Sequence, residues 1–223
     1  MHFFDPDSPL MNGLSRMTDL VLLNLITLAA CLPVFTAGAS LTAMHFVLLK
    51  MVRGEEGYIV RDWVKSFKQN FREATLIWLL FLAAGLMALL DIWMAAYGKG
   101  GAALVLRVLL ILVILIAYAD FLWAFPLLSR FEGTVPGILS AAMAMAFRAF
   151  PRTLAMGAAG AMPLIIWIFF PSMAPLVLLF GASLPGLVSA YMYSPLFKKL
   201  EKERESREEE PEKDPGEEED PAL

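Results

Sequence analysis

Long uncharged segments follow one another along most of the chain. Residues 20–49 and 153–197 contain 30 and 45 residues without a formal charge, and further apolar runs begin at Ala74 and Ala102. A membrane-spanning helix needs about 20 mostly apolar residues, because backbone polar groups cannot be left unpaired in lipid. The pattern therefore predicts an all-α, polytopic transmembrane helical bundle.

Helix-breaking residues divide the two longest runs. Pro33 and Gly38 interrupt the first, and Pro171 and Pro175 interrupt the second, so each predicts a helical hairpin. We expect six spans in three hairpins, with five as the alternative if the segment after Gly38 is re-entrant or interfacial. The expected spans are about 18–34, 38–53, 74–97, 102–125, 152–170 and 175–194.

Two segments between the apolar runs, 57–72 and 134–150, have an amphipathic pattern instead. In the first, apolar residues recur at helical spacing beside a basic stripe, which is typical of a helix lying on an anionic inner leaflet. The second starts at Thr134, a suitable N-cap, and ends before Pro151. The predicted contacts of the first helix with the membrane surface or a partner are Arg61, Trp63, Lys65, Phe67, Lys68, Phe71 and Arg72.

Composition and charge strengthen the membrane prediction. Hydrophobic residues make up 58% and charged residues 18% of the chain, against roughly 45–50% and 25% in a soluble domain. The formal charge of −4 is unevenly distributed, because residues 1–197 carry +2 and residues 198–223 carry −6. The acidic end also contains three prolines, so we expect 198–223 to be a disordered cytoplasmic tail.

The positions of the basic residues predict the orientation. Segments 50–72, 130–152 and 198–204 are basic, whereas the turns on the other side of the expected spans contain a single basic residue, Lys99. Basic segments stay in the cytoplasm, so we expect a multi-pass protein of the cell membrane with both termini cytoplasmic.

Several function classes lack the residues that they need. Cys31 is the single cysteine, and the chain has two histidines, no H-E-x-x-H motif and no Walker A motif. Ser40 and His45 lie five residues apart, about 140° around a helix, so they cannot form a nucleophile–base pair. The scattered cations form no phosphate-binding face. We therefore expect no enzyme activity, no cofactor, no metal and no nucleic-acid partner.

Polar residues within the expected spans are the candidate functional residues. Asp91 and Arg107 fall at similar depth on either side of the turn at Lys99, where they could neutralise each other or line a solute pathway. Asp19 falls opposite Lys50 and Arg53 and predicts a clamp at the cytoplasmic boundary.

Three further polar residues lie deeper in the expected spans. Asp120 has no counter-charge in its own hairpin, so it is either protonated and hydrogen-bonded or responsive to protons or cations together with His45. Asn24 and His45 have similar depth and could share a hydrogen bond.

The small residues Gly38, Ala39 and Ala43 predict a close approach of two helices.

The first 75 residues contain several short motifs. They are Phe-Phe-Asp-Pro-Asp-Ser-Pro at 3–9, Leu-Pro at 32–33, Thr-Ala-Gly-Ala-Ser at 36–40, Lys-Met-Val-Arg at 50–53, Glu-Glu-Gly-Tyr at 55–58 and Ser-Phe-Lys-Gln-Asn-Phe at 66–71. These motifs resemble those of the YesL-like family of bacterial integral membrane proteins. Beyond them only the hydropathy is similar. The family has no established activity. Its members typically occur beside carbohydrate ABC transporters, glycoside hydrolases and two-component sensors, which implies an accessory role in sugar uptake and a bacterial cell membrane.

Two hypotheses follow. The first is a non-enzymatic accessory or regulatory membrane protein, associated with carbohydrate uptake, whose partners are the lipid bilayer and a carbohydrate ABC transporter or sensor kinase. The second is a small permease or channel, compatible with a homo-oligomer, whose route uses Asp91, Arg107, Asp120 and His45.

Overall fold

The computed structural model describes residues 9–55, 57–97 and 101–209, and these residues contain helices and no strand. The all-α prediction is confirmed. The helices are α1 (Pro9–Cys31), α2 (Ala37–Arg53), α3 (Ile59–Gln69), α4 (Phe71–Tyr97), α5 (Gly101–Arg130), α6 (Val135–Arg148), α7 (Phe150–Phe169), α8 (Ala174–Phe180) and α9 (Ser183–Glu209), with short 3₁₀ turns at Val34–Thr36 and Pro171–Met173.

Within these residues, five helices are long and apolar enough to cross a membrane. A sixth span exists if Pro171–Phe180 and Ser183–Ser206, which are bent by 54° at their junction, cross as one. The sequence predicts a single span over 175–194, whereas the structure interrupts it between α8 and α9. The segment after Gly38, for which a re-entrant path was the alternative, is the continuous helix α2.

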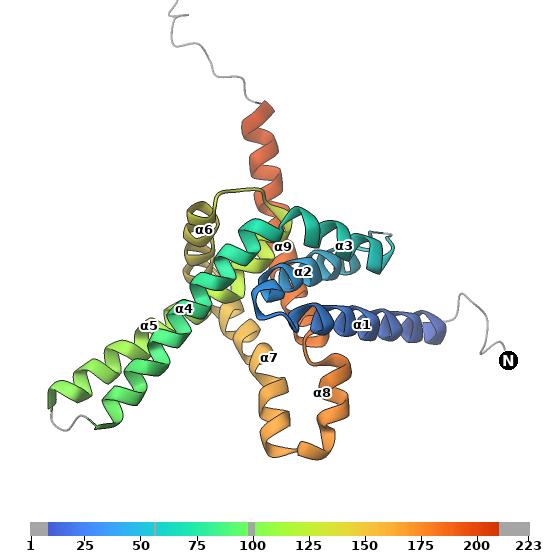
Figure 1. The fold of residues 1–223 in the computed structure, drawn as a ribbon. Coiled ribbons are helices and arrows are strands. Elements are labelled where there is room, and N and C mark those ends of the chain that lie inside the picture. Colours follow the sequence, from blue (N-terminus) through green and yellow to red (C-terminus); the bar gives the residue numbers. More distant parts are fainter. Residues whose placement is uncertain (1–8, 56, 98–100, 210–223) are drawn as a thin grey trace, which may run out of the picture.

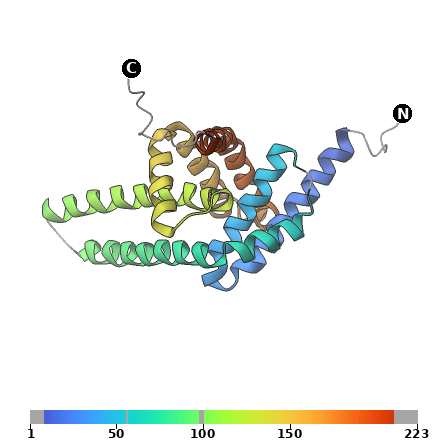
Figure 2. The same cartoon turned by 90° about the horizontal axis from the view of Figure 1, so that it is seen from above.

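The hairpins diverge from a common centre. Figures 1 and 2 show α4 and α5 side by side and projecting away from α1, while α7 and α8 project in a third direction. The largest fully buried side chains lie where the hairpins meet and include Trp123, Phe125, Tyr193 and Phe197. The outer halves of α4 and α5 expose apolar side chains such as Leu86 and Leu106, as lipid-facing helices do.

Helix α2 lies at the centre and is packed against α1, α3, α4, α5 and α9. Gly38 allows a close approach of α4, since a Cβ added there would overlap the Ala74 carbonyl oxygen and lie 2.5 Å from Trp78 Cβ. The predicted close helix approach is thus confirmed at Gly38. Trp78 Nε1 also donates a 2.7 Å hydrogen bond to the Val34 carbonyl oxygen.

Helix α3 folds back along α2, which the sequence pattern did not predict. Gly54 ends α2 in the left-handed conformation, with a φ of 70°. A 2.7 Å salt bridge between Lys50 Nζ and Asp62 Oδ2 then joins α2 and α3 beside this turn. As a result, the start of α4 lies against the start of α2, although the charge pattern assigned these two places to opposite sides of the membrane.

The predicted tail is partly structured. Helix α9 continues through Glu209 and so includes residues 198–209 of the expected tail, where pairs such as Lys199 and Glu203 support a helix. Residues 210–223 lie outside the described part of the chain, as do residues 1–8 with most of the 3–9 motif and residues 98–100 with the Lys99 turn.

Candidate functional site

Three charged side chains from three helices meet beyond the apolar part of the bundle. Arg53, at the end of α2, forms a two-pronged contact with Glu201 of α9, with both Nη–Oε distances at 3.1 Å. Arg130, at the end of α5, donates from Nε to Glu201 Oε1 at 2.5 Å. We call Arg53, Arg130 and Glu201 the Glu201 latch, because this one carboxylate ties α2, α5 and α9 together.

The electrostatics of the latch follow from burial and the two cations. Burial raises the pKa of the Glu201 carboxyl, but the hydrogen bonds and charges of Arg130 and Arg53 outweigh it, so the pKa lies below its ordinary value. The Arg53 side chain is only 6% exposed, and its Nε has no hydrogen-bond partner. Loss of Glu201 would therefore leave a buried guanidinium without its main counter-charge.

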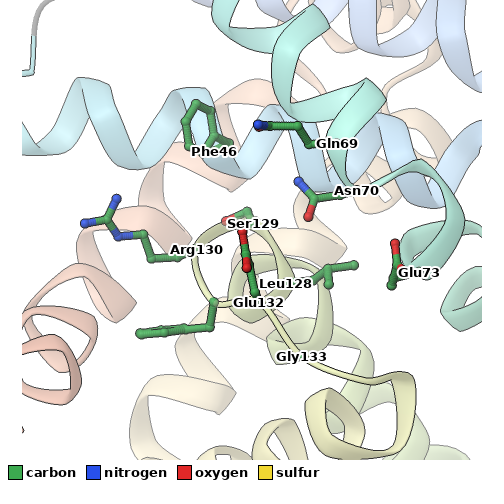
Figure 3. A pocket seen from close by; sticks show the side chains of 10 residues that line it. Phe46, Gln69, Asn70, Glu73, Leu128, Ser129, Arg130, Glu132 and Gly133 are labelled. Atoms are coloured by element: carbon green, nitrogen blue, oxygen red, sulfur yellow. The ribbon is translucent and has the colours of Figure 1, made fainter. Parts of the chain in front are cut away.

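A pocket of about 480 Å³ opens beside the latch, and we call it the junction pocket (Figure 3). It lies where α3 passes into α4, against the end of α5. Figure 3 shows Arg130 on one side of the pocket, Glu73 on the other and Glu132 between them. Its lining residues are Phe46, Gln69, Asn70, Glu73, Leu128, Ser129, Arg130, Phe131, Glu132 and Gly133.

The structure divides the predicted contact residues of α3 into two faces. Trp63 is buried, donates from Nε1 to Thr27 Oγ1 at 3.2 Å, and stacks on Phe67 with a ring separation of 4.9 Å. The prediction that Trp63 contacts the leaflet or a partner is therefore wrong, because α1 and α2 cover this face. The exposed side carries Val60 and Val64 together with Arg61, Lys65 and Lys68; Phe71 and Arg72, at the start of α4, are also exposed.

Asn24 has partners other than the predicted His45. Its Nδ2 donates to the Leu178 carbonyl oxygen at 2.7 Å, and its Oδ1 accepts from the Ala182 and Ser183 amides at 2.8 and 2.9 Å. The side chain thus supplies hydrogen bonds that the interrupted helix α8–α9 cannot make itself. His45 instead lies 3.3 Å from the Tyr193 hydroxyl, measured from Nδ1. The predicted Asn24–His45 bond is wrong.

The other intramembrane residues have different outcomes. Lys50 pairs with Asp62 and Arg53 with Glu201, so the predicted clamp with the half-buried Asp19 is replaced by these contacts. Asp120 is buried, and its Oδ1 has no hydrogen-bond partner.

The outer pair of the sequence prediction lies on neighbouring helices. Asp91 and Arg107 are exposed on the outer parts of α4 and α5, and their pairing stays a prediction. Ser40 donates to the Thr27 carbonyl oxygen at 2.8 Å, which is an ordinary contact between α1 and α2.

Sequence reasoning missed the latch and the pocket. Glu201 was counted with the acidic tail, yet it follows Phe197 by one helical turn and so continues the inward face of α9. That spacing is the signal that could have identified it. Glu73 and Glu132 belong to segments far apart in sequence, and no pattern joins them.

A comparison with protein families supports the resemblance of the N-terminal part. A family described as "Protein of unknown function, DUF624" matches residues 20–92. This family is the YesL-like group. The match runs from the second half of α1 through most of α4, including Asn24, Trp63 and Glu73, but excludes Arg130 and Glu201. No curated protein and no solved structure matches the chain.

Proposed function

We propose that this chain is a non-enzymatic accessory or regulatory protein of a bacterial cell membrane, that it is associated with carbohydrate uptake, and that it acts by binding a cytoplasmic protein partner. The carbohydrate association comes from the family resemblance. The partner would be the ATPase subunit of a carbohydrate ABC transporter or a sensor kinase.

One observation carries the proposal. In Figure 1, α3, α6 and the outward end of α9 lie on one side of the molecule, while the α4–α5 and α7–α8 hairpins point away from it. These elements contain the basic segments of the chain, which the positive-inside rule assigns to the cytoplasm. A cytoplasmic partner would therefore meet this side, and both termini would lie in the cytoplasm.

The docking surface that we propose is the exposed side of α3. Val60 and Val64 supply apolar area, and Arg61, Lys65 and Lys68 supply positive charge next to it. None of these three cations has an ion pair among the described residues. An acidic partner surface with an apolar centre would complement this face.

Co-purification in mild detergent tests the proposal. Arg61→Glu combined with Lys65→Glu should abolish recovery of the partner while the melting temperature of the protein stays unchanged, because both side chains are exposed. Lys202→Glu, an exposed charge reversal on α9, is the matched control and should retain the partner. Partner recovery that is identical in all three proteins would contradict the proposal. Trp63→Ala is unsuitable here because Trp63 supports the fold.

A small permease or channel is the second candidate, and Asp120 is the observation that favours it. A buried carboxylate oxygen without a partner within an apolar helix is costly and is typical of ion or proton pathways. Solute flux into proteoliposomes should then occur with the wild-type protein and fall with Asp120→Asn. Flux that is absent, or unchanged by this substitution, would remove this candidate.

A further inference from the structure

The junction pocket carries more negative than positive charge, because the two carboxylates of Glu73 and Glu132 and the single guanidinium of Arg130 line it. The Arg130 charge is shared with Glu201, which accepts from its Nε, and Asn70 Nδ2 is bound to the Ser66 carbonyl oxygen at 3.0 Å. The Glu73 and Glu132 carboxylates form no ion pair with the described residues, and Asn70 keeps its amide oxygen free of the Ser66 contact. A complementary ligand therefore needs N–H donors and positive charge.

Phe131, an aromatic residue of the pocket lining, already contacts a guanidinium of the protein that lies outside the lining. The guanidinium carbon of Arg204, on the exposed part of α9, lies 5.8 Å from the centre of the Phe131 ring, which is a cation–π contact. Phe131 lines the pocket, and Phe46 lines it from α2. The Phe131 ring thus already contacts one guanidinium from outside the pocket, and the Phe46 and Phe131 side chains add apolar surface to the cavity that the two carboxylates line.

The dimensions agree with a small ligand group. A volume of about 480 Å³ is within the range of sites for small molecules, roughly 300–1,000 Å³. Glu132 is exposed, so a ligand could enter without rearrangement of the helices.

We propose that the junction pocket binds an organic cation, namely the guanidinium or ammonium group of a free small molecule or of a basic side chain on a protein. Glu73 and Glu132 supply the negative charge, the Asn70 and Gln69 amides supply further acceptors, and the Phe46 and Phe131 rings form apolar walls. The site is distinct from the α3 docking surface, so it does not depend on the proposed function.

Isothermal titration of the full chain in nanodiscs, with neutral isosteres of each cation, tests the proposal. The free-molecule arm compares propylguanidinium with propylurea. The protein arm compares a capped Gly-Gly-Arg-Gly-Gly peptide with the same peptide carrying citrulline in place of arginine. Each cation should bind at least about tenfold more tightly than its isostere, and the affinity should fall as salt rises from about 50 to 500 mM. Binding in one arm only identifies the source of the group.

Two isosteric variants and a control complete the experiment. Glu73→Gln and Glu132→Gln should each weaken binding of the cation about fivefold or more, whereas Glu203→Gln, on the exposed part of α9, should leave it unchanged. A melting curve of each variant shows whether it is folded, and Glu132 lies between α5 and α6, outside both helices. Equal affinity for cation and isostere, no binding in either arm, or binding unaffected by both glutamine variants would overturn the proposal.

Discussion

At the scale of single residues, Asn24 shows how one side chain supports an interrupted membrane helix. The break between α8 and α9 leaves backbone groups without helical partners, and such groups are costly when buried away from water. Asn24 is fully buried and binds one carbonyl and two amides there, across more than 150 residues of sequence. The sequence identified Asn24 as an important polar residue but assigned it a partner in its own hairpin, because only depth within a hairpin can be read from spacing.

Asn24→Ala should destabilise the protein by about 2–4 kcal/mol, since it removes three hydrogen bonds and leaves three buried backbone groups unpaired. The measurement is reversible unfolding in mixed detergent micelles. Leu25→Ala is the matched control, because this neighbouring side chain is exposed and should be nearly neutral. Equal stability of the two variants would show that the α8–α9 break does not need Asn24.

At the scale of helices, the contact between α2 and α4 depends on the missing side chain of Gly38. The periodicity of small residues predicted a close approach but not the helix that makes it. The partner is α4, because α3 folds back along α2 and brings Ala74 to Gly38. Helix α3 is similar in this respect: its two-sided pattern was visible in the sequence, whereas the burial of the Trp63 side by α1 and α2 was not.

Gly38→Ala should push α4 away from α2 and cost about 1–3 kcal/mol, because the added methyl group meets backbone rather than a flexible side chain end. Gly85→Ala, in the exposed part of α4, has no atom within 4 Å of the added group and should be neutral or slightly stabilising. Thermal unfolding in detergent compares the two. A Gly38→Ala protein as stable as Gly85→Ala would contradict the close contact.

At the scale of the whole molecule, the Glu201 latch joins the ends of α2 and α5 to α9, and these helices belong to different hairpins. Its carboxylate has a pKa below the ordinary value of about 4.3. The latch therefore contributes its full stability above that ordinary pKa, and the contribution is lost as the pH falls through the lower pKa of the folded protein.

Glu201→Gln should lower the stability at pH 7 by about 1–3 kcal/mol, because the buried Arg53 loses its main counter-charge. It should also reduce the loss of stability that the wild-type protein shows between about pH 5 and pH 3. Melting temperatures across this range provide the measurement. Glu203→Gln is the control, since Glu203 and Lys199 form a solvent-exposed pair 3.8 Å apart and contribute little. If the melting temperatures of wild type and Glu201→Gln changed with pH in parallel, the latch would not be the source of this stability.

The sequence by itself determined that this chain is all-helical and which segments form the five helices that are long and apolar enough to cross a membrane. The charge pattern also predicts that the basic segments share one side of the membrane, and this stays a prediction. Each of these follows from local composition, because lipid accepts only long apolar helices and the charge bias acts on short loops. Tertiary structure decided which helices touch, and hence that Trp63 is buried, that Asn24 holds the α8–α9 break, and that Glu201 joins two arginines. Lipid tails are as apolar as leucine, so hydrophobicity does not choose between helix pairs in a membrane. Close packing and hydrogen bonds between residues distant in sequence make that choice, and they are established only when the whole chain is folded.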